Sequence, residues 1–204
     1  MLKIDMVFYT LTILICMMLI GALNYFIAVP IFGFDLPYVV VAVVVGTIAE
    51  IIIDLIFAFI VRWLLPSKWF GVSKVGFHAG KRERKFYEKI GIKRWKDSVL
   101  ELGALSGFRK NKLDKPNDVS YIERFIVEAN YGIIVHVAGI IAGFAVIFLY
   151  PIKYWLCFGF PVALVNLFLN ALPIFILRYN LPKLHALYKF NKARNEKANN
   201  NAEE

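Results

Sequence analysis

Four long apolar runs constrain the fold more than any other feature of this sequence. They cover about Met6 to Ile27, Val39 to Trp63, Gly132 to Tyr150 and Tyr154 to Ile176. Crossing a hydrocarbon core of about 30 Å takes a helix of about 20 apolar residues, which each run can supply. Backbone groups in lipid must be bonded within the protein, and four runs are too few to close a barrel. The sequence therefore predicts an all-α integral membrane protein with four transmembrane helices.

Composition agrees with a membrane protein and excludes several enzyme classes. Hydrophobic residues make up 59% of the chain, and its mean hydropathy of +0.62 is well above that of soluble proteins. The two cysteines, Cys16 and Cys157, lie in apolar runs without metal-ligand spacing. The sequence contains no Walker loop, dinucleotide-binding glycine fingerprint, Gly-x-Ser-x-Gly elbow or His-Glu-x-x-His motif. We therefore expect no metal and no bound cofactor.

The distribution of Lys and Arg predicts the orientation in the membrane. Fifteen of these residues lie between Lys68 and Arg124 and six between Arg178 and Lys197, whereas the loop from Pro30 to Pro37 has none. Loops rich in Lys and Arg stay in the cytoplasm, so both termini and the central segment are predicted to face the cytoplasm of a bacterial inner membrane. The net charge of +9 then favours anionic membrane lipids as partners. No nucleic-acid-binding motif accompanies the charge, so nucleic acid is not expected.

The central segment, residues 68–124, is more than a linker. Aromatic and aliphatic residues recur there among Lys and Arg at helical spacing. Such a pattern predicts cytoplasmic amphipathic helices between the second and third spans, with a break at Gly91. We expect residues 1–185 to form a single four-helix membrane domain. Residues 186–204 are polar and are predicted to be a disordered cytoplasmic tail. The oligomeric state is not indicated.

Two acidic residues, Glu50 and Asp54, lie inside the second apolar run. A spacing of four residues places them on one face of a helix. Carboxylates at membrane depth are costly unless they are neutralised, paired or wetted, so an intramembrane pair indicates a functional polar site. The alternative is that the acids only pair with cations or hydroxyls of neighbouring helices.

The third apolar run contributes a histidine, His136, which is a candidate general base because imidazole takes a proton near neutral pH. Glu128 lies on the same helix, but about 12 Å away along its axis, so it cannot orient the imidazole. An acid from another helix is needed, and Glu50 and Asp54 are available. Alternatively, His136 only forms a hydrogen bond across the bundle.

Small and polar residues predict how the spans meet. Gly139 and Gly143 have the GxxxG spacing that permits close helix contact, and Asn166 and Asn170 share one face of the fourth run. We interpret the asparagines as interhelical hydrogen-bonding residues rather than substrate ligands. Arg178 follows the fourth run, where it either extends to the interface or binds a phosphate or carboxylate of a ligand.

Three segments in combination resemble the glycosyl-diaponeurosporenoate acyltransferase family. They are FYEKIGIKRWKDSVLELGALSGFRK (Phe86 to Lys110), ERFIVEANYGIIVH (Glu123 to His136) and LRYNLPKL (Leu177 to Leu184). The resemblance covers roughly the last two thirds of the chain. It implies a membrane acyltransferase of carotenoid or glycolipid biosynthesis, which moves a fatty acyl group to a hydroxyl of a lipid-linked sugar. The implied co-substrate is an acyl thioester of coenzyme A or an acyl carrier.

The resemblance also implies roles for individual residues. Its catalytic positions are Glu128 and His136, and its substrate-binding positions are Tyr87, Trp95, Lys96, Asp97, Arg178 and Asn180. Ile133 stands where many relatives have a second acid, which shifts the role of the acid to Glu50 and Asp54. Our hypothesis is that His136, supported by an acid of the second span, removes the proton of the acceptor hydroxyl.

The sequence is also compatible with functions other than acyl transfer. A small membrane methyltransferase or reductase would need a cofactor site, and no glycine-rich or acidic ribose-binding pattern supports one. A non-enzymatic ion or proton pathway, or a membrane assembly partner, would use Glu50 and Asp54 to line a wet path. His78 and Glu83 superficially resemble the His-x4-Asp signature of glycerolipid acyltransferases, but the acid is Glu and the surrounding pattern is absent.

Overall fold

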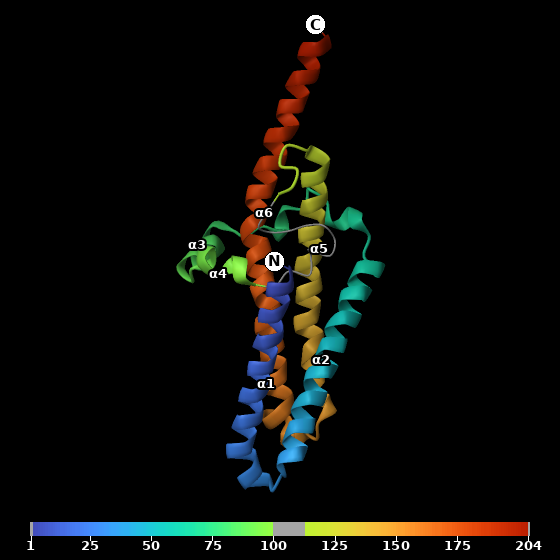
Figure 1. Cartoon of the computed structure of the whole chain (residues 1–204). Coiled ribbons are helices and arrows are strands. Elements are labelled where there is room, and N and C mark those ends of the chain that lie inside the picture. Colours follow the sequence, from blue (N-terminus) through green and yellow to red (C-terminus); the bar gives the residue numbers. More distant parts are fainter. Residues whose placement is uncertain (1, 100–112, 204) are drawn as a thin grey trace. The chain divides into compact units, whose positions relative to one another are not determined.

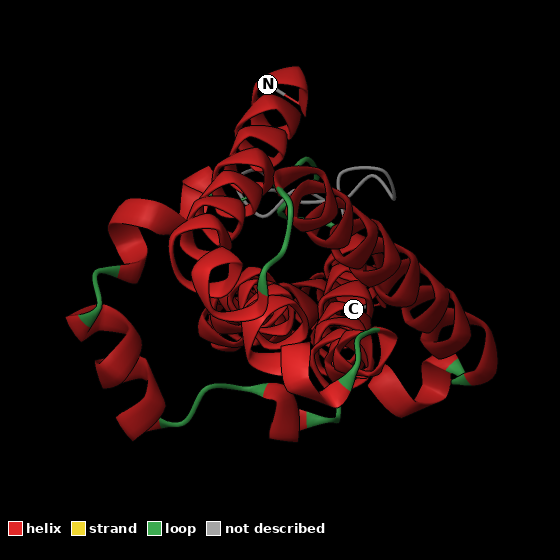
Figure 2. Ribbon diagram, turned by 90° about the horizontal axis from the view of Figure 1, so that it is seen from below, coloured by secondary structure: helices red, strands yellow, loops and turns green. Residues whose placement is uncertain are grey.

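A computed structural model describes residues 2–99 and 113–203, and all regular structure in these ranges is helical (Figures 1 and 2). The four long helices are α1 (Leu2–Phe32), α2 (Leu36–Leu64), α5 (Val119–Gly143) and α6 (Phe160–Glu203). The short ones are η1 (Ser67–Phe70), η2 (Val75–Phe77), α3 (Lys81–Lys89), α4 (Ile92–Trp95), η3 (Lys96–Ser98), η5 (Phe144–Leu149), η6 (Ile152–Tyr154) and the π-helix η7 (Trp155–Gly159). Part of the predicted amphipathic segment, residues 100–112, lies outside the described ranges.

Within residues 2–99 and 113–203, four helical stretches are long and apolar enough to cross a membrane, which confirms the four predicted spans. They are Thr10–Phe32, Leu36–Leu64, Val119–Leu149 and Ile152–Asn201. The third helix starts 13 residues earlier than the predicted span at Gly132, because a helix can continue past its apolar part. Its first turn is capped by Asp118, whose Oδ1 accepts the backbone N–H of Tyr121 at 3.1 Å. The chain is a multi-pass membrane protein.

The chain divides into two compact units, and each draws on two separate stretches of sequence. Unit 1 comprises Met1–Trp63 and Val135–Leu172, and unit 2 comprises Leu64–Ile134 and Pro173–Glu204. Helices α5 and α6 therefore contribute residues to both units. The single membrane domain over residues 1–185 stays a prediction.

Unit 1 is held together by an apolar core that includes Val39, Val146, Phe158 and Val162. The turn between α1 and α2 and the turn from η5 into η7 lie at the same end of this unit (Figure 1). Near that end the hydroxyl of Tyr150 donates to the carbonyl of Ala42 at 2.7 Å. This buried backbone-directed bond fixes the end of the third span against α2.

Unit 2 packs the short helices of the central segment against α6. Tyr87 of α3 and Ile92 of α4 are buried in one cluster with Ile176 and Tyr179 of α6. Gly91 separates α3 from α4 with φ +72°, a left-handed conformation that glycine adopts without strain, so the predicted break is confirmed. The location of these helices on a membrane surface stays a prediction.

The polar end of the chain, residues 186–203, continues α6, whereas the sequence predicted disorder. Pro182 is the last proline, and Ala, Lys, Arg and Glu after it are good helix formers. In addition, the side-chain amide of Asn191 donates to the carbonyl of Pro116 at 2.7 Å. Low apolar content removes the packing that orders a segment, but it does not remove helix propensity.

Candidate functional site

The polar residues of the membrane spans meet inside unit 1. His136 of α5 and Asp54 of α2 are joined through Asn170 of α6. The distance from Nδ1 of His136 to Oδ1 of Asn170 is 2.8 Å, and Nδ2 of Asn170 lies 3.0 Å from Oδ2 of Asp54. The structure thus brings the predicted base and one predicted acid together, with an amide between them. We call these three residues the histidine relay.

The hydrogen bonds of the histidine relay select one tautomer of His136. A carboxylate only accepts hydrogen bonds, so the NH₂ group of Asn170 must face Asp54. The amide oxygen of Asn170 then faces His136 and requires a proton on Nδ1. The lone pair of the imidazole is consequently on Nε2, the nitrogen that points away from the relay.

Asn166 extends the relay along α6. Nδ2 of Asn170 also lies 2.6 Å from Oδ1 of Asn166, and Nδ2 of Asn166 donates to the carbonyl of Gly139 at 3.2 Å. Both asparagines are buried. The bond between the two asparagines lies within α6, whereas those to Gly139, His136 and Asp54 are interhelical, as the sequence indicated.

Glu50 lies beside the relay without a bonding partner. Its side chain is 6% exposed, and among the described residues neither carboxyl oxygen has a hydrogen bond. Oδ1 of Asp54 is unpartnered in the same sense. Native proteins rarely leave buried polar atoms unsatisfied, so unpartnered carboxyl oxygens indicate a ligand or a proton.

The two glycines of the third span provide the room for these side chains. A Cβ at Gly143 would collide with Oε1 of Glu50 and Nδ2 of Asn166, and one at Gly139 would lie 2.8 Å from Oδ1 of Asp54. The GxxxG spacing therefore makes space for polar side chains as well as for close helix contact.

Gly143→Ala is expected to lower the thermal unfolding temperature of the protein in detergent micelles. Inserting a methyl group into packed surroundings costs about 1 to 3 kcal/mol, and here it also displaces Glu50. Gly21→Ala is the matched control in α1, because a Cβ there meets nothing within 4 Å. Equal unfolding temperatures for the two variants would contradict the packing around Gly143.

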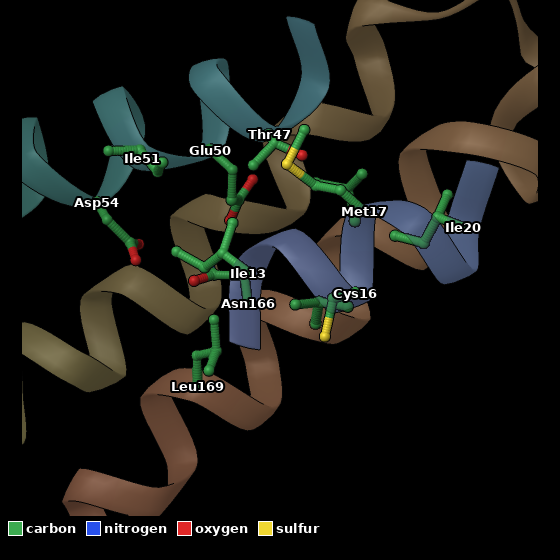
Figure 3. Close-up of a pocket in the computed structure, with 12 residues that line it drawn as sticks. Ile13, Cys16, Met17, Ile20, Thr47, Glu50, Ile51, Asp54, Asn166 and Leu169 are labelled. Carbon is green, nitrogen blue, oxygen red and sulfur yellow. The ribbon is translucent and has the colours of Figure 1, made fainter. Parts of the chain in front are cut away.

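A pocket opens beside Glu50 between α1, α2 and α6 (Figure 3). The pocket is partly open, with about 440 Å³ of space when the region outside its mouth is included, and apolar side chains line most of it. Glu50 lies about 18 Å along α2 from Arg62 at the end of the helix, and Asp54 about 12 Å, at about 1.5 Å per residue. Half of a hydrocarbon core is about 15 Å, so the pocket lies at membrane depth.

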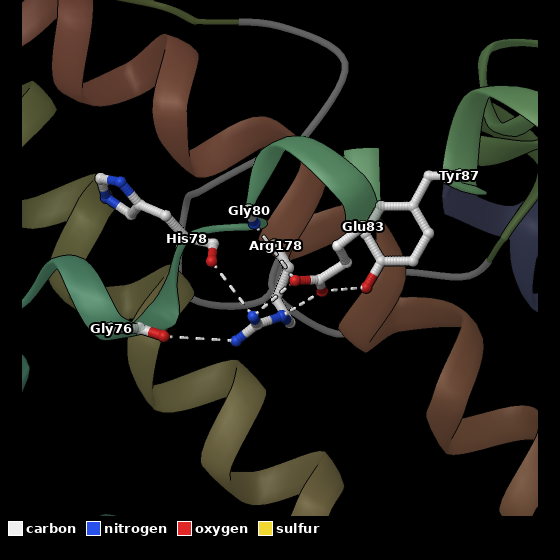
Figure 4. A network of polar contacts seen from close by, with 6 residues as sticks. All are labelled: Gly76, His78, Gly80, Glu83, Tyr87 and Arg178. Atoms are coloured by element: carbon white, nitrogen blue, oxygen red, sulfur yellow. Dashed lines mark hydrogen bonds and ion pairs between the residues drawn. The ribbon is translucent and has the colours of Figure 1, made fainter. Parts of the chain in front are cut away.

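A second polar network lies in unit 2 and is centred on Arg178 (Figure 4). Its guanidinium binds Glu83 through two hydrogen bonds, of 2.5 Å from Nε and 2.8 Å from Nη2. It also donates to the backbone carbonyls of His78 and Gly76. The hydroxyl of Tyr87 donates to the same carboxylate. Arg178 and Tyr87, which the resemblance placed at the substrate, therefore bind Glu83 and fix residues 76–83 to α6.

Glu83 makes the stability of unit 2 depend on pH. Hydrogen bonds from Arg178, helped by Tyr87 and the N–H of Gly80, outweigh burial and lower the pKa of Glu83 from 4.5 to about 2. A lowered carboxyl pKa stabilises the fold above the unfolded-state value, and that stability disappears as pH falls through the folded-state value. We expect stability to fall between about pH 4.5 and 2, and Glu83→Gln to flatten this dependence. Urea unfolding monitored by circular dichroism measures it, with the exposed Glu123→Gln as control.

The other predicted site residues lie elsewhere in unit 2. The indole of Trp95 donates to the carbonyl of Ile90 at 3.0 Å, and Lys96 pairs with its neighbour Asp97 at 2.9 Å. Glu128 and Asn180 are half-buried on α5 and α6. None of these residues belongs to the unit that contains His136.

Sequence reasoning missed one pairing in unit 2. The ring of His78 packs edge-to-face on that of His185, with centroids 4.0 Å apart, while Glu83 binds Arg178. His78 and Glu83 thus have different partners and do not form the catalytic dyad of a His-x4-acid signature. No local pattern marks His185, because its partner is distant in the sequence.

In the described ranges, four helices long and apolar enough to cross a membrane and a half-buried histidine relay define a multi-pass membrane protein with an intramembrane polar site. The sequence profile of the glycosyl-4,4'-diaponeurosporenoate acyltransferase family matches residues 66–190, more than half of the chain. The protein belongs to this family, as its motifs indicated. Searches of curated proteins and of solved structures gave no match. The matched range contains His136 and Asn170, whereas Glu50 and Asp54 precede it.

Proposed function

We propose that this protein is a membrane acyltransferase that moves a fatty acyl group to a hydroxyl of a lipid-linked sugar, such as a glycosyl carotenoid. The observation that carries the proposal is the histidine relay, which holds His136 with its Nε2 lone pair available. Membership of the acyltransferase family supports the reaction class.

The relay suits general-base catalysis. Nε2 of His136 takes the proton of the sugar hydroxyl while the hydroxyl oxygen attacks the carbonyl carbon of an acyl thioester. The new C–O bond forms, the C–S bond breaks, and the imidazolium returns its proton to the thiolate. Asp54 stabilises the imidazolium through Asn170. This catalysis contributes about 10²- to 10⁴-fold, and positioning of the two amphiphiles supplies further acceleration.

Cationic residues of the central segment attract the charged head of the acyl donor. Arg178 is held by Glu83 through two hydrogen bonds, so this role passes to the exposed Arg94 and to Lys93 and Lys96, whose single contacts with Glu88 and Asp97 lie nearer the surface. With the central segment and both termini at the cytoplasmic face of a bacterial inner membrane, these cations meet a donor that the cytoplasm supplies. Anionic lipids bind the same basic segment.

Mass spectrometry of membrane lipids from cells with and without the gene tests the proposed function. The expected result is a gene-dependent species heavier than a glycolipid by one fatty acyl group, and its formation in isolated membranes should depend on added acyl thioester. Proton flux through the reconstituted protein without such a product would instead favour the proton-pathway alternative. Glu50, whose carboxyl oxygens are unpartnered among the described residues, is the residue that would line such a pathway.

A further inference from the structure

Among the described residues of unit 1, no hydrogen-bond partner contacts the carboxyl group of Glu50. The hydroxyl of Thr47, one turn away on α2, donates to the carbonyl of Val43 at 2.8 Å. The amide of Asn166 donates to Gly139. No Lys, Arg or His lies among the residues that line the pocket. Thr47 is thus engaged and Asn166 uses one of its two N–H groups on Gly139, and among the described residues neither donates to Glu50.

A carboxylate in these surroundings would be an uncompensated charge at membrane depth. Such charges are costly, and a carboxyl group avoids the cost by holding its proton. The neutral acid has one O–H donor, which in turn needs an acceptor. Figure 3 shows the carboxyl groups of Glu50 and Asp54 apart, with Glu50 facing the pocket.

The pocket walls indicate what carries that acceptor. Ile13 and Met17 of α1 and Val162, Val165 and Leu169 of α6 form an apolar lining next to Glu50. Side chains of this kind pack against a hydrocarbon chain. They offer no further ligands for a cation, and no group of three His, Cys, Asp or Glu residues suited to a metal occurs in the described part of the chain. A ligand bearing a carboxylate would be repelled by Asp54, which also lines the pocket.

We propose that this pocket binds a lipid chain bearing an uncharged oxygen, an ester carbonyl or a hydroxyl, and that protonated Glu50 donates a hydrogen bond to that oxygen. The inference rests on the proposed function only where it identifies the lipid as a substrate of acyl transfer. The binding site itself is tested independently of catalysis.

Carbodiimide labelling detects the protonated carboxyl group of Glu50 directly. Dicyclohexylcarbodiimide partitions into the membrane and adds to a protonated carboxyl group: the proton goes to a carbodiimide nitrogen and the carboxyl oxygen bonds the central carbon. The adduct then rearranges to a stable N-acylurea. Peptide mass spectrometry of the protein in lipid vesicles is expected to find the adduct on Glu50. Absence of labelling at Glu50 would overturn the proposal.

Protection from labelling identifies the ligand. Methyl palmitate in the vesicles is expected to slow labelling of Glu50 at least about fivefold, whereas hexadecane, which lacks the oxygen, should leave the rate unchanged. Equal protection by both would overturn recognition of the oxygen. Protection by sodium or calcium ions but not by the ester would show a cation site instead.

Variants separate the pocket from the rest of the bundle. Cys16→Trp fills the pocket and is expected to abolish protection by methyl palmitate, whereas Met18→Trp, on a face of α1 where Met18 is 65% exposed, should retain it. Unchanged protection in Cys16→Trp would place the ester elsewhere and overturn the proposal.

Retention of tritiated methyl palmitate by purified protein should be similar in Glu50→Gln, which keeps a neutral donor, and at least about tenfold weaker in Glu50→Leu. Equal retention in these two would also overturn it.

Acyl transfer and lipid binding beside Glu50 can be disproved independently of each other. His136→Ala should keep the protection of Glu50 by methyl palmitate while losing acyl transfer. Protection without any acyl transfer by the unaltered protein would remove only the proposed function. Acyl transfer without protection would remove only the lipid site.

Discussion

Replacing His136 by Ala is expected to slow acyl transfer about 10²- to 10⁴-fold, the contribution that a positioned general base makes. The relay fixes the imidazole through Nδ1 and leaves the lone pair of Nε2 to accept the proton. Initial rates of acyl transfer in isolated membranes, at saturating thioester and equal protein amounts, measure the effect.

His78→Ala is the matched control for this experiment. It also removes an imidazole, but one in unit 2 that packs on His185. Burial, followed by the nearby charges of Arg178 and Lys189, lowers the pKa of His78. We expect His78→Ala to retain most of the turnover. The reverse ranking of the two variants would transfer the catalytic role to the segment containing His78 and Glu83.

Asn170→Leu should reduce acyl transfer nearly as far as loss of His136 itself. The substitution keeps the approximate volume but removes the amide that sets the tautomer of His136 and connects it to Asp54. Without that amide the imidazole can place its proton on Nε2, which makes it unable to act as a base. It also leaves Nδ1 of His136 and Oδ2 of Asp54 without their bonds, at a cost of about 1 to 3 kcal/mol each.

Asn24→Leu separates the chemical effect of Asn170 from its effect on stability. Asn24 is buried in unit 1 and donates to the carbonyls of Ile20 and Cys157 at 2.9 and 2.6 Å. Its replacement should lower the unfolding temperature in detergent comparably, yet leave acyl transfer close to normal. If both variants lost activity in proportion to stability, the relay would have only a structural role.

Hydropathy was sufficient to predict the spans, because lipid admits few structures and their lengths are fixed by the bilayer. The spacing of Glu50 and Asp54 likewise placed them on one face of α2. The structure continues α6 through residues 186–203, where Ala, Lys, Arg and Glu favour a helix despite the low apolar content from which the sequence predicts disorder. Local patterns thus predicted the elements better than their ends.

Partnerships between distant residues could not be predicted from spacing. Asn170 lies 116 residues from Asp54, and Arg178 lies 95 residues from Glu83. The sequence predicts an acid of the second span to support His136 and leaves Arg178 either extending to the interface or binding a ligand. In the structure an amide stands between acid and base, and the carboxylate of Glu83 binds the guanidinium. Which side chains meet depends on how each helix is rotated about its own axis, and residue spacing in one sequence does not predict that rotation.

In the proposed mechanism His136 and Asn170 act as one catalytic unit, and a double-mutant cycle measures their coupling directly. Rates of thioester-dependent acyl transfer would be compared for the unaltered protein, His136→Ala, Asn170→Leu and the double variant in identical nanodiscs. The effects of residues that act as a unit are not additive. The rate of the double variant should therefore lie within about threefold of the rate of His136→Ala. Multiplication of the two single effects in the double variant would contradict the relay, as would near-normal transfer by either single variant.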